Sequence, residues 1–271
     1  MYKLIACDLD ETLLNDQKEI SPRNVQAIKQ AVAKGVFFVP NTGRNFLTVQ
    51  DNLRELGLYQ QANSYVISFN GGAIVENHGN HVLTTNFLPF DVVKSLFELG
   101  VKNDYCIHVY SLDKLYIWNI NDEEVNYLSG RVSDWEELKE DNIDALEKVK
   151  LIKIIFNVAS KNERKEMEKV VQNNIDYSLN ITFSSDRYIE FNSSEADKGQ
   201  ALLKLGKMLN IEEHEIIAIG DNGNDLAMIK TAGLGVAVAN AHELIKENAN
   251  FITSNDNNNS AVAEVIEKFI L

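Results

Sequence analysis

Cysteine, long apolar runs and positive charge are all scarce in this chain of 271 residues. Its two cysteines, Cys7 and Cys106, lie far apart and outside any C-x-x-C or metal-type spacing, so we expect both to be buried, reduced thiols. No apolar run approaches the roughly 20 residues that span a bilayer, so no membrane is expected as a partner. Met1 leads straight into a strand pattern without the charged start of an export signal, and we expect a cytoplasmic protein.

The charge balance is acidic. The chain has 26 Lys and Arg residues against 40 Asp and Glu, a net charge of −14. This balance argues against a nucleic-acid backbone as the main partner. Residues 122–148 are especially acidic, with ten acidic and three basic side chains, and we interpret them as a solvated helical face. An acidic protein that binds an anionic substrate must supply positive potential locally, from a metal ion, a lysine or helix N-termini.

Two acids follow directly after the first apolar run of the chain. Residues 2–7 predict a strand buried on both faces, and Asp8, Asp10 and Thr12 come next. Side chains at i and i+2 of a strand point the same way, so the two carboxylates would repel each other. At the carboxyl end of a strand a divalent cation can neutralise them, and Mg²⁺ is suited because it takes oxygen ligands with only one or two carboxylates. A polar turn is the alternative interpretation at this point.

Strand and helix patterns alternate in the first part of the chain. Apolar runs at residues 36–39 and 64–69 predict two further buried strands, and the segments that begin at Ser21-Pro22 and at Asn45 predict the intervening helices. Short connections between such elements predict a parallel sheet with right-handed crossovers. Ligands of such sheets bind beyond the carboxyl ends of the strands.

The middle of the chain follows a different pattern. After a predicted hairpin at residues 73–85, α+β patterns continue until the strand–helix rhythm returns at Lys198. We therefore predict an α/β fold with a doubly wound, Rossmann-like parallel-sheet core, split in sequence into residues 1–84 and 189–271. Residues 85–188 are predicted to form an inserted α+β domain.

Polar clusters at strand ends and helix starts meet the requirements of phosphoryl transfer. That reaction needs positioning and charge neutralisation more than elaborate covalent chemistry. A carboxylate nucleophile, a metal ion, a second carboxyl group that moves protons and a lysine with amide or hydroxyl donors suffice. The candidates are Asp8, Asp10 and Thr12, then Thr42 and Gly43, then Lys198, and finally Asp221, Asn224 and Asp225.

The four clusters together resemble the motifs of the haloacid dehalogenase-like phosphatases. Residues 8–13 (DLDETL) match D-x-D-x-T-L, residues 42–44 match T-G-R, Lys198 matches the third motif, and residues 220–225 (GDNGND) match G-D-x-x-N-D. The resemblance covers the whole chain, including Asn70-Gly71 and residues 240–243 (NAHE). It is specifically to the Cof-type branch, in which a large cap, here residues 85–188, is inserted between the second and third motifs.

The resemblance implies a role for each motif residue. Asp8 would be the nucleophile and a Mg²⁺ ligand, and Asp10 the general acid/base, whose backbone carbonyl also binds the metal. Asp221 would complete the protein ligands, and Asp225 would support them or bind the metal through water. Phosphoryl oxygens would be held by Thr42, Lys198, Asn224 and the amides of Leu9 and Gly43. Thr12 would brace the loop.

Other residues have two interpretations each. Arg44 could bind substrate or pair with a carboxylate, and Asn70 could reach the substrate or simply form a turn. Asn41 stands where the family often has a small apolar residue. In the cap, three side chains could line a specificity pocket or serve only in packing or at the surface: His108, Tyr110 and Arg187.

We therefore expect a Mg²⁺-dependent phosphatase of small phosphorylated metabolites, such as sugar phosphates, that acts through an aspartyl-phosphate. A phosphomutase would use the same groups and return the phosphate to a sugar. A phospho-accepting signalling module also has an aspartate, Mg²⁺, a hydroxyl residue and a lysine, but it needs no inserted domain. A binding protein without activity is the remaining alternative. The sequence makes no prediction of an oligomeric state.

Overall fold

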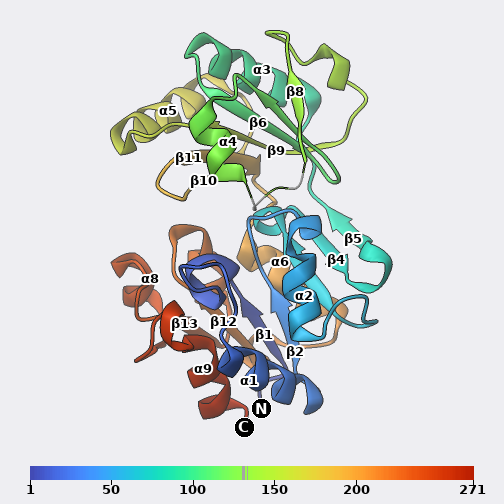
Figure 1. Ribbon diagram of the computed structural model, residues 1–271, viewed down its shortest axis with the longest axis vertical. Coiled ribbons are helices and arrows are strands. Elements are labelled where there is room, and N and C mark those ends of the chain that lie inside the picture. The colour runs from blue at the N-terminus through green and yellow to red at the C-terminus, as the bar shows by residue number, and fades with distance from the viewer. Residues whose placement is uncertain (130–131, 133) are drawn as a thin grey trace. The chain divides into compact units, whose positions relative to one another are not determined.

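The structure, a computed structural model, describes residues 1–129, 132 and 134–271 (Figure 1). These residues divide into two compact units, one formed by residues 1–85 with 196–271 and the other by residues 86–195. Strand β11 (Tyr188–Ser193) belongs to the second unit because it pairs along its length with β9 (Leu151–Asn157). The predicted boundary after residue 188 cuts this strand, so the inserted unit extends beyond the predicted range of residues 85–188.

The first unit is built on a five-stranded parallel sheet. Its order is β14-β13-β12-β1-β2, and every neighbouring pair is parallel. The strands are β1 (Leu4–Cys7), β2 (Phe37–Pro40), β12 (Ile216–Gly220), β13 (Leu234–Ala237) and β14 (Phe251–Ile252). All residues of the central strand β12 and of its neighbour β1 are buried, as expected for strands covered on both faces. The predicted parallel-sheet core is confirmed.

Helices of both chain segments cover this sheet. The first segment supplies α1 (Pro22–Ala33) and α2 (Gln50–Leu56), and the second supplies α6 (Lys198–Met208), α7 (Leu226–Thr231), α8 (Glu243–Asn248) and α9 (Ala261–Phe269). Helix α1 packs against α9 from the other end of the chain, and α6 packs against α7, from which strand β12 separates it in sequence. Ser21 caps α1 by accepting from the Asn24 amide, and Pro22 occupies the first turn as predicted.

The third predicted strand leaves the parallel sheet. Strand β3 (Tyr65–Ser68) forms an antiparallel sheet with β4 (Ala73–Glu76) and β5 (His81–Thr85). It is joined to the chain after β2 by a parallel bridge between Asn41 and Ile67. Strand β2 ends in Pro40, which has no N–H to donate to a ladder, so regular pairing with β3 is not established there.

The second unit is a six-stranded sheet with helices on it. Its order is β10-β11-β9-β6-β7-β8, with β6 (Cys106–Ser111), β7 (Leu115–Trp118), β8 (Glu136–Leu138) and β10 (Leu179–Ser184). Apolar side chains of β6, β9 and β11 form a core with residues of α3 (Phe90–Lys102) and α5 (Lys161–Asn174), including Phe97, Phe156 and Met167. A smaller cluster joins Leu128 of α4 (Asp122–Leu128) to Cys106 and Ile117.

The acidic stretch is not one continuous helix. Helix α4 ends at Leu128, and residues 136–138 form β8, which pairs in parallel with β7. The predicted helical face over residues 122–148 is therefore wrong at residues 136–138, which form a strand. Among the described residues, no helix combines the length and the apolar character required to cross a membrane. Both cysteines are buried and free, as predicted.

Candidate active site

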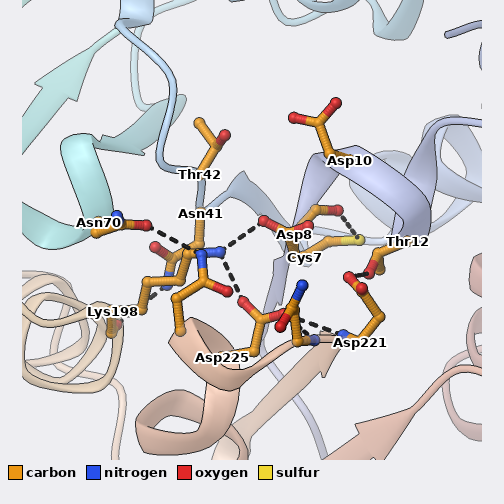
Figure 2. A network of polar contacts seen from close by, with 12 residues as sticks. Cys7, Asp8, Asp10, Thr12, Asn41, Thr42, Asn70, Lys198, Asp221 and Asp225 are labelled. Atoms are coloured by element: carbon orange, nitrogen blue, oxygen red, sulfur yellow. Dashed lines mark hydrogen bonds and ion pairs between the residues drawn. The ribbon is translucent and has the colours of Figure 1, made fainter. Parts of the chain in front are cut away.

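The predicted clusters meet at one edge of the parallel sheet. Strand β1 pairs with both β2 and β12, so the residues that follow these strands emerge side by side. Asp8 follows β1, Thr42 follows β2 and Asp221 follows β12. Helix α6 brings Lys198 to the same place, since Asp197 caps the helix by accepting from the Gln200 amide at 2.8 Å. Figure 2 shows Lys198 reaching Asp8, with Asp221 close by.

Lys198 lies between two carboxylates. Its Nζ is 2.6 Å from Asp8 Oδ1 and 2.6 Å from Asp225 Oδ1, and all three side chains are buried. Burial alone would lower the pKa of Lys198, but the charges of Asp225 and Asp8 outweigh it and raise that pKa. Burial raises the pKa of Asp8 to about 7, although Lys198 opposes the shift. The lysine is therefore held charged, next to a carboxylate whose charge is poorly solvated.

Asp225 organises the loop that carries Asp221. Its Oδ2 accepts from the backbone amides of Asp221 at 3.0 Å and Asn222 at 3.1 Å, while its Oδ1 pairs with Lys198. A Cβ on Gly220 would lie 2.6 Å from the Asp225 carboxylate, so only glycine allows this close approach. Asp225 therefore supports the site through hydrogen bonds.

Asp221 is fixed from the first loop. The Thr12 hydroxyl donates to Asp221 Oδ1 at 2.7 Å, so Thr12 braces this carboxylate. Burial, then the nearby charges of Asp225 and Asp8, raises the pKa of Asp221 well above its ordinary value. The position of Asp221 is set, but among the described residues no cationic side chain forms an ion pair with it.

The acidic cluster has the donor set of a site for a hard cation. Asp8, Asp221 and Asp225 are buried, and each offers an oxygen within 4.8 Å of the others. The negative charges of these three carboxylates exceed the single positive charge of Lys198. Magnesium and calcium prefer oxygen ligands of this kind. Because Asp225 is engaged with Lys198 and two amides, Asp8 and Asp221 are the carboxylates best placed to hold an ion.

Asp10 points elsewhere. Figure 2 shows its carboxylate turned away from the Lys198 ion pairs. Arg44 Nε donates to Asp10 Oδ2 at 2.7 Å, Arg44 Nη2 contacts Oδ1, and Lys18 Nζ lies 3.4 Å from Oδ1. Burial acts to raise the pKa of Asp10, but Arg44 and then Lys18 outweigh it and lower the pKa. Of the two interpretations of Arg44, the structure therefore places it on a carboxylate. Lys18 was missed, because nothing in its sequence neighbourhood marks it.

Three of the five residues predicted to bind phosphate lie together around Asn70: Thr42, Gly43 and Asn224. Asn224 Nδ2 donates to Asn70 Oδ1 at 3.1 Å, and the Asn70 backbone amide donates to the Thr42 carbonyl at 3.0 Å. Thr42 Oγ1 accepts from the Arg44 backbone amide. A Cβ on Gly43 would come within 3.0 Å of Asn70 Oδ1. That oxygen is a side-chain atom, so a larger residue at this position would require the Asn70 side chain to shift by a few tenths of an ångström.

Asn41 also belongs to the site, which the sequence alone did not reveal. Its side chain is fully buried, and its Nδ2 donates to the Lys198 carbonyl at 3.0 Å and lies 3.4 Å from Met228 Sδ. The polar residue in place of a small apolar one thus links the end of β2 to the start of α6. That departure from the family pattern was the only sequence signal.

The candidate cap residues are engaged within the second unit. His108 Nε2 lies 3.2 Å from Glu124, which is fully buried and also accepts a hydrogen bond from the Tyr188 hydroxyl. Arg187 pairs with Glu123 at 2.6 Å and stacks on the Tyr127 ring. Lys153 lies 5.0 Å from the centre of the Tyr110 ring. Glu124 had been counted among the solvated acids, so sequence reasoning missed this buried network.

Comparisons with known proteins agree with this geometry. The family model of the haloacid dehalogenase-like hydrolases matches residues 5–266. YxeH of Bacillus subtilis is 35% identical over 271 residues, covering 100% of this chain and 99% of that protein. The 5-amino-6-(5-phospho-D-ribitylamino)uracil phosphatase YcsE of Bacillus subtilis is 33% identical over 269 residues, covering 99% of this chain and 96% of that protein.

Solved structures give the same result. A haloacid dehalogenase-like hydrolase from Bacteroides thetaiotaomicron superposes with a TM-score of 0.85 at 30% identity, and the match covers 100% of both chains. The family match spans both halves of the first unit and the whole insertion. The chain therefore belongs to the haloacid dehalogenase-like hydrolases, the family that its four motifs resemble.

Proposed function

We propose that the chain is a Mg²⁺-dependent phosphatase that hydrolyses small phosphorylated metabolites through an aspartyl-phosphate on Asp8. The observation that carries this proposal is the buried cluster in which Lys198 joins Asp8 to Asp225, with Asp221 beside them. A carboxylate with a lysine at 2.6 Å, at the edge of a parallel sheet where ligands bind, is suited to attack an anionic phosphate.

The first step transfers the phosphoryl group to the protein. An Asp8 carboxylate oxygen attacks phosphorus, and the bond from phosphorus to the ester oxygen breaks. Asp10, in its protonated form, gives its proton to the departing oxygen, so an alcohol leaves and the aspartyl-phosphate forms. The Asp10 side chain, with 42% of its surface exposed, must turn from Arg44 to do this.

The second step returns the protein to its starting state. Asp10, now a carboxylate, takes a proton from a water molecule whose oxygen attacks phosphorus. The bond between phosphorus and the Asp8 oxygen breaks, which releases inorganic phosphate and restores the Asp8 carboxylate. Asp10 then carries the proton that the next cycle needs.

The metal and the phosphate have separate binding groups in this proposal. Asp8 and Asp221, with the Asp10 carbonyl, would hold Mg²⁺, and Asp225 would support them through its amide contacts. When bound, Mg²⁺ screens the nucleophile from the phosphate oxygens. The remaining phosphate oxygens would be held by Thr42, Lys198, Asn224 and the amides of Leu9 and Gly43.

The substrate class is inferred from the chemistry and from relatives. The name of YcsE describes a phosphate ester on a ribityl chain. We extend this to small phosphate monoesters on sugar-like alcohols, without naming one. A screen of phosphorylated metabolites for phosphate release would identify the preferred substrate. Phosphate that moved between positions of a sugar without release would indicate a phosphomutase instead.

A trapping experiment tests the covalent step. The purified chain, with Mg²⁺, would be incubated with beryllium fluoride, which mimics a phosphoryl group on a carboxylate, and its crystal structure determined. The proposal predicts the adduct on an Asp8 oxygen. An adduct on another side chain would refute Asp8 as the nucleophile.

A further inference from the structure

The asparagines near the end of the chain have no part in the reaction just described. We propose that Asn240, oriented by Asn257, is a positioning residue that holds the loop carrying Asp10 in place. This inference rests on the proposed role of Asp10 as general acid/base. The residues concerned all lie in the first unit.

The contact with the loop is made next to Asp10. Asn240 Nδ2 donates to the Glu11 carbonyl oxygen at 2.7 Å. Glu11 has a φ of 60°, in the left-handed region that side-chain-bearing residues seldom adopt. A conformation of this kind persists only where neighbouring groups hold it. Asn240 supplies such a contact, one residue after Asp10.

Asn257 fixes which way the Asn240 amide faces. The Asn257 backbone amide donates to Asn240 Oδ1 at 3.0 Å, so the Asn240 nitrogen is the atom that faces Glu11. Asn257 is itself buried, and its side-chain nitrogen lies 3.1 Å from both the Leu14 carbonyl and Asp16 Oδ1. The two asparagines therefore hold the first loop at Glu11 and again at Leu14.

Asn240 also stands next to the loop of Asp221. The His242 amide donates to the Asp221 carbonyl at 2.9 Å, only two residues beyond Asn240. The short segment from Asn240 to His242 thus bonds to the loop of the acid/base on one side and to the loop of a proposed metal ligand on the other. It sets the spacing between these two loops.

Misplacing a general acid has a chemical signature. A poor leaving group needs a proton as its bond to phosphorus breaks, whereas p-nitrophenolate leaves readily without one. The ratio kcat/KM reports steps up to formation of the phosphoenzyme. A variant with a displaced Asp10 should therefore lose more kcat/KM with phenyl phosphate than with p-nitrophenyl phosphate.

The experiment compares four variants on these two substrates. Asn240→Ala removes the contact, and Asn240→Asp keeps the oxygen that accepts from Asn257 while placing an oxygen against the Glu11 carbonyl. Asn248→Ala is the matched control, because Asn248 Nδ2 also donates to an exposed backbone carbonyl at 2.7 Å, that of Leu244. Asp10→Asn sets the reference for complete loss of the acid.

In both Asn240 variants we expect kcat/KM to fall about tenfold with phenyl phosphate and no more than about threefold with p-nitrophenyl phosphate. These losses are smaller than the full contribution of a general acid, because Asp10 is displaced and not removed. Asn248→Ala should match the wild type on both substrates. The Asn240 variants could instead lose kcat/KM equally on both substrates, or not at all, while Asp10→Asn loses more with phenyl phosphate. That result would overturn the role of Asn240 and leave the role of Asp10 intact. If Asp10→Asn does not discriminate, the proposed role of Asp10 itself fails.

Discussion

Both units bury carboxylates, but they differ in how far neighbouring donors and cations offset the charge of these groups. In the second unit, the Glu124 carboxylate accepts hydrogen bonds from the Tyr188 hydroxyl and from Asn157 Nδ2. His108 Nε2 and Arg187 Nη2 lie 3.2 and 3.6 Å from the same carboxylate. Burial acts to raise the pKa of Glu124, but His108 and Tyr188 outweigh it and lower the pKa. In the first unit, burial prevails for Asp8 and Asp221, whose pKa values are raised.

This difference separates a structural network from a reactive one. A buried carboxylate with several donors is stable as it is and has little capacity for another ligand. Three carboxylates around one lysine keep uncompensated negative charge, which a divalent cation would neutralise. Strongly perturbed carboxylates in a cluster of this kind are typical of functional sites.

The largest expected effect is that of Asp8→Asn. The substitution keeps the shape of the side chain but removes the proposed nucleophile, so turnover of p-nitrophenyl phosphate should fall by at least about a thousandfold. Steady-state kinetics would measure the fall, and circular dichroism would check folding. Glu124→Gln is the matched carboxylate-to-amide control in the second unit and should retain most of the activity. Substantial activity in a folded Asp8→Asn protein would contradict the proposal.

Metal removal should act on the first unit alone. Dialysis against a chelator should abolish p-nitrophenyl phosphate hydrolysis, and added Mg²⁺ should restore it, because Asp8 and Asp221 would otherwise keep their uncompensated charge. Thermal unfolding followed by near-ultraviolet circular dichroism would show whether the fold survives the treatment. Hydrolysis that is indifferent to the chelator would exclude the metal assignment.

Removing Glu124 should instead affect stability. Glu124→Ala leaves the Tyr188 hydroxyl, the Asn157 amide and Arg187 without their buried acceptor, and we expect a loss of about 3 kcal/mol in unfolding free energy. Urea denaturation of the variant and the wild type would measure it. Exposed Glu140→Ala is the control and should change stability by less than about 0.5 kcal/mol. A Glu124 variant as stable as the wild type would show that the network has no structural role.

The smallest expected effect is the pH dependence of the stability that the Glu124 carboxylate contributes. Because the pKa of Glu124 is lower in the folded chain than its ordinary value of 4.5, its ionised form stabilises the fold above that pH. This contribution is lost as the pH falls through the lowered pKa. The stability difference between wild type and Glu124→Gln should therefore be constant near neutral pH and shrink below about pH 4.5. A difference that grows with acid would contradict the assignment.

Sequence reasoning succeeded where main-chain topology decides position. Asp8, Thr42 and Asp221 converge because each follows a parallel strand, and the carboxyl ends of such strands share one edge. Lys198 could be placed with them because it opens a helix that returns to the same sheet. These positions follow from strand order, which the apolar runs and short connections predict well.

Side-chain contacts between distant segments could not be predicted in the same way. The pairing of Asp10 with Arg44, the link from Asn41 to Lys198 and the contact of Asn240 with Glu11 all depend on loop conformations. Composition also misled, since Glu124 lies in an acidic stretch and is nevertheless fully buried. Charge along the sequence does not show which acid faces inward.

The most direct measurement of the difference between the two units is the location of a trapped phosphoryl analogue. A crystal structure of the chain with beryllium fluoride and Mg²⁺ should show the adduct on Asp8, with Lys198 beside it and Asp221 at the metal. The second unit should keep Glu124 in its present contacts. An adduct on any residue other than Asp8, or a metal held away from Asp8 and Asp221, would contradict the proposed chemistry.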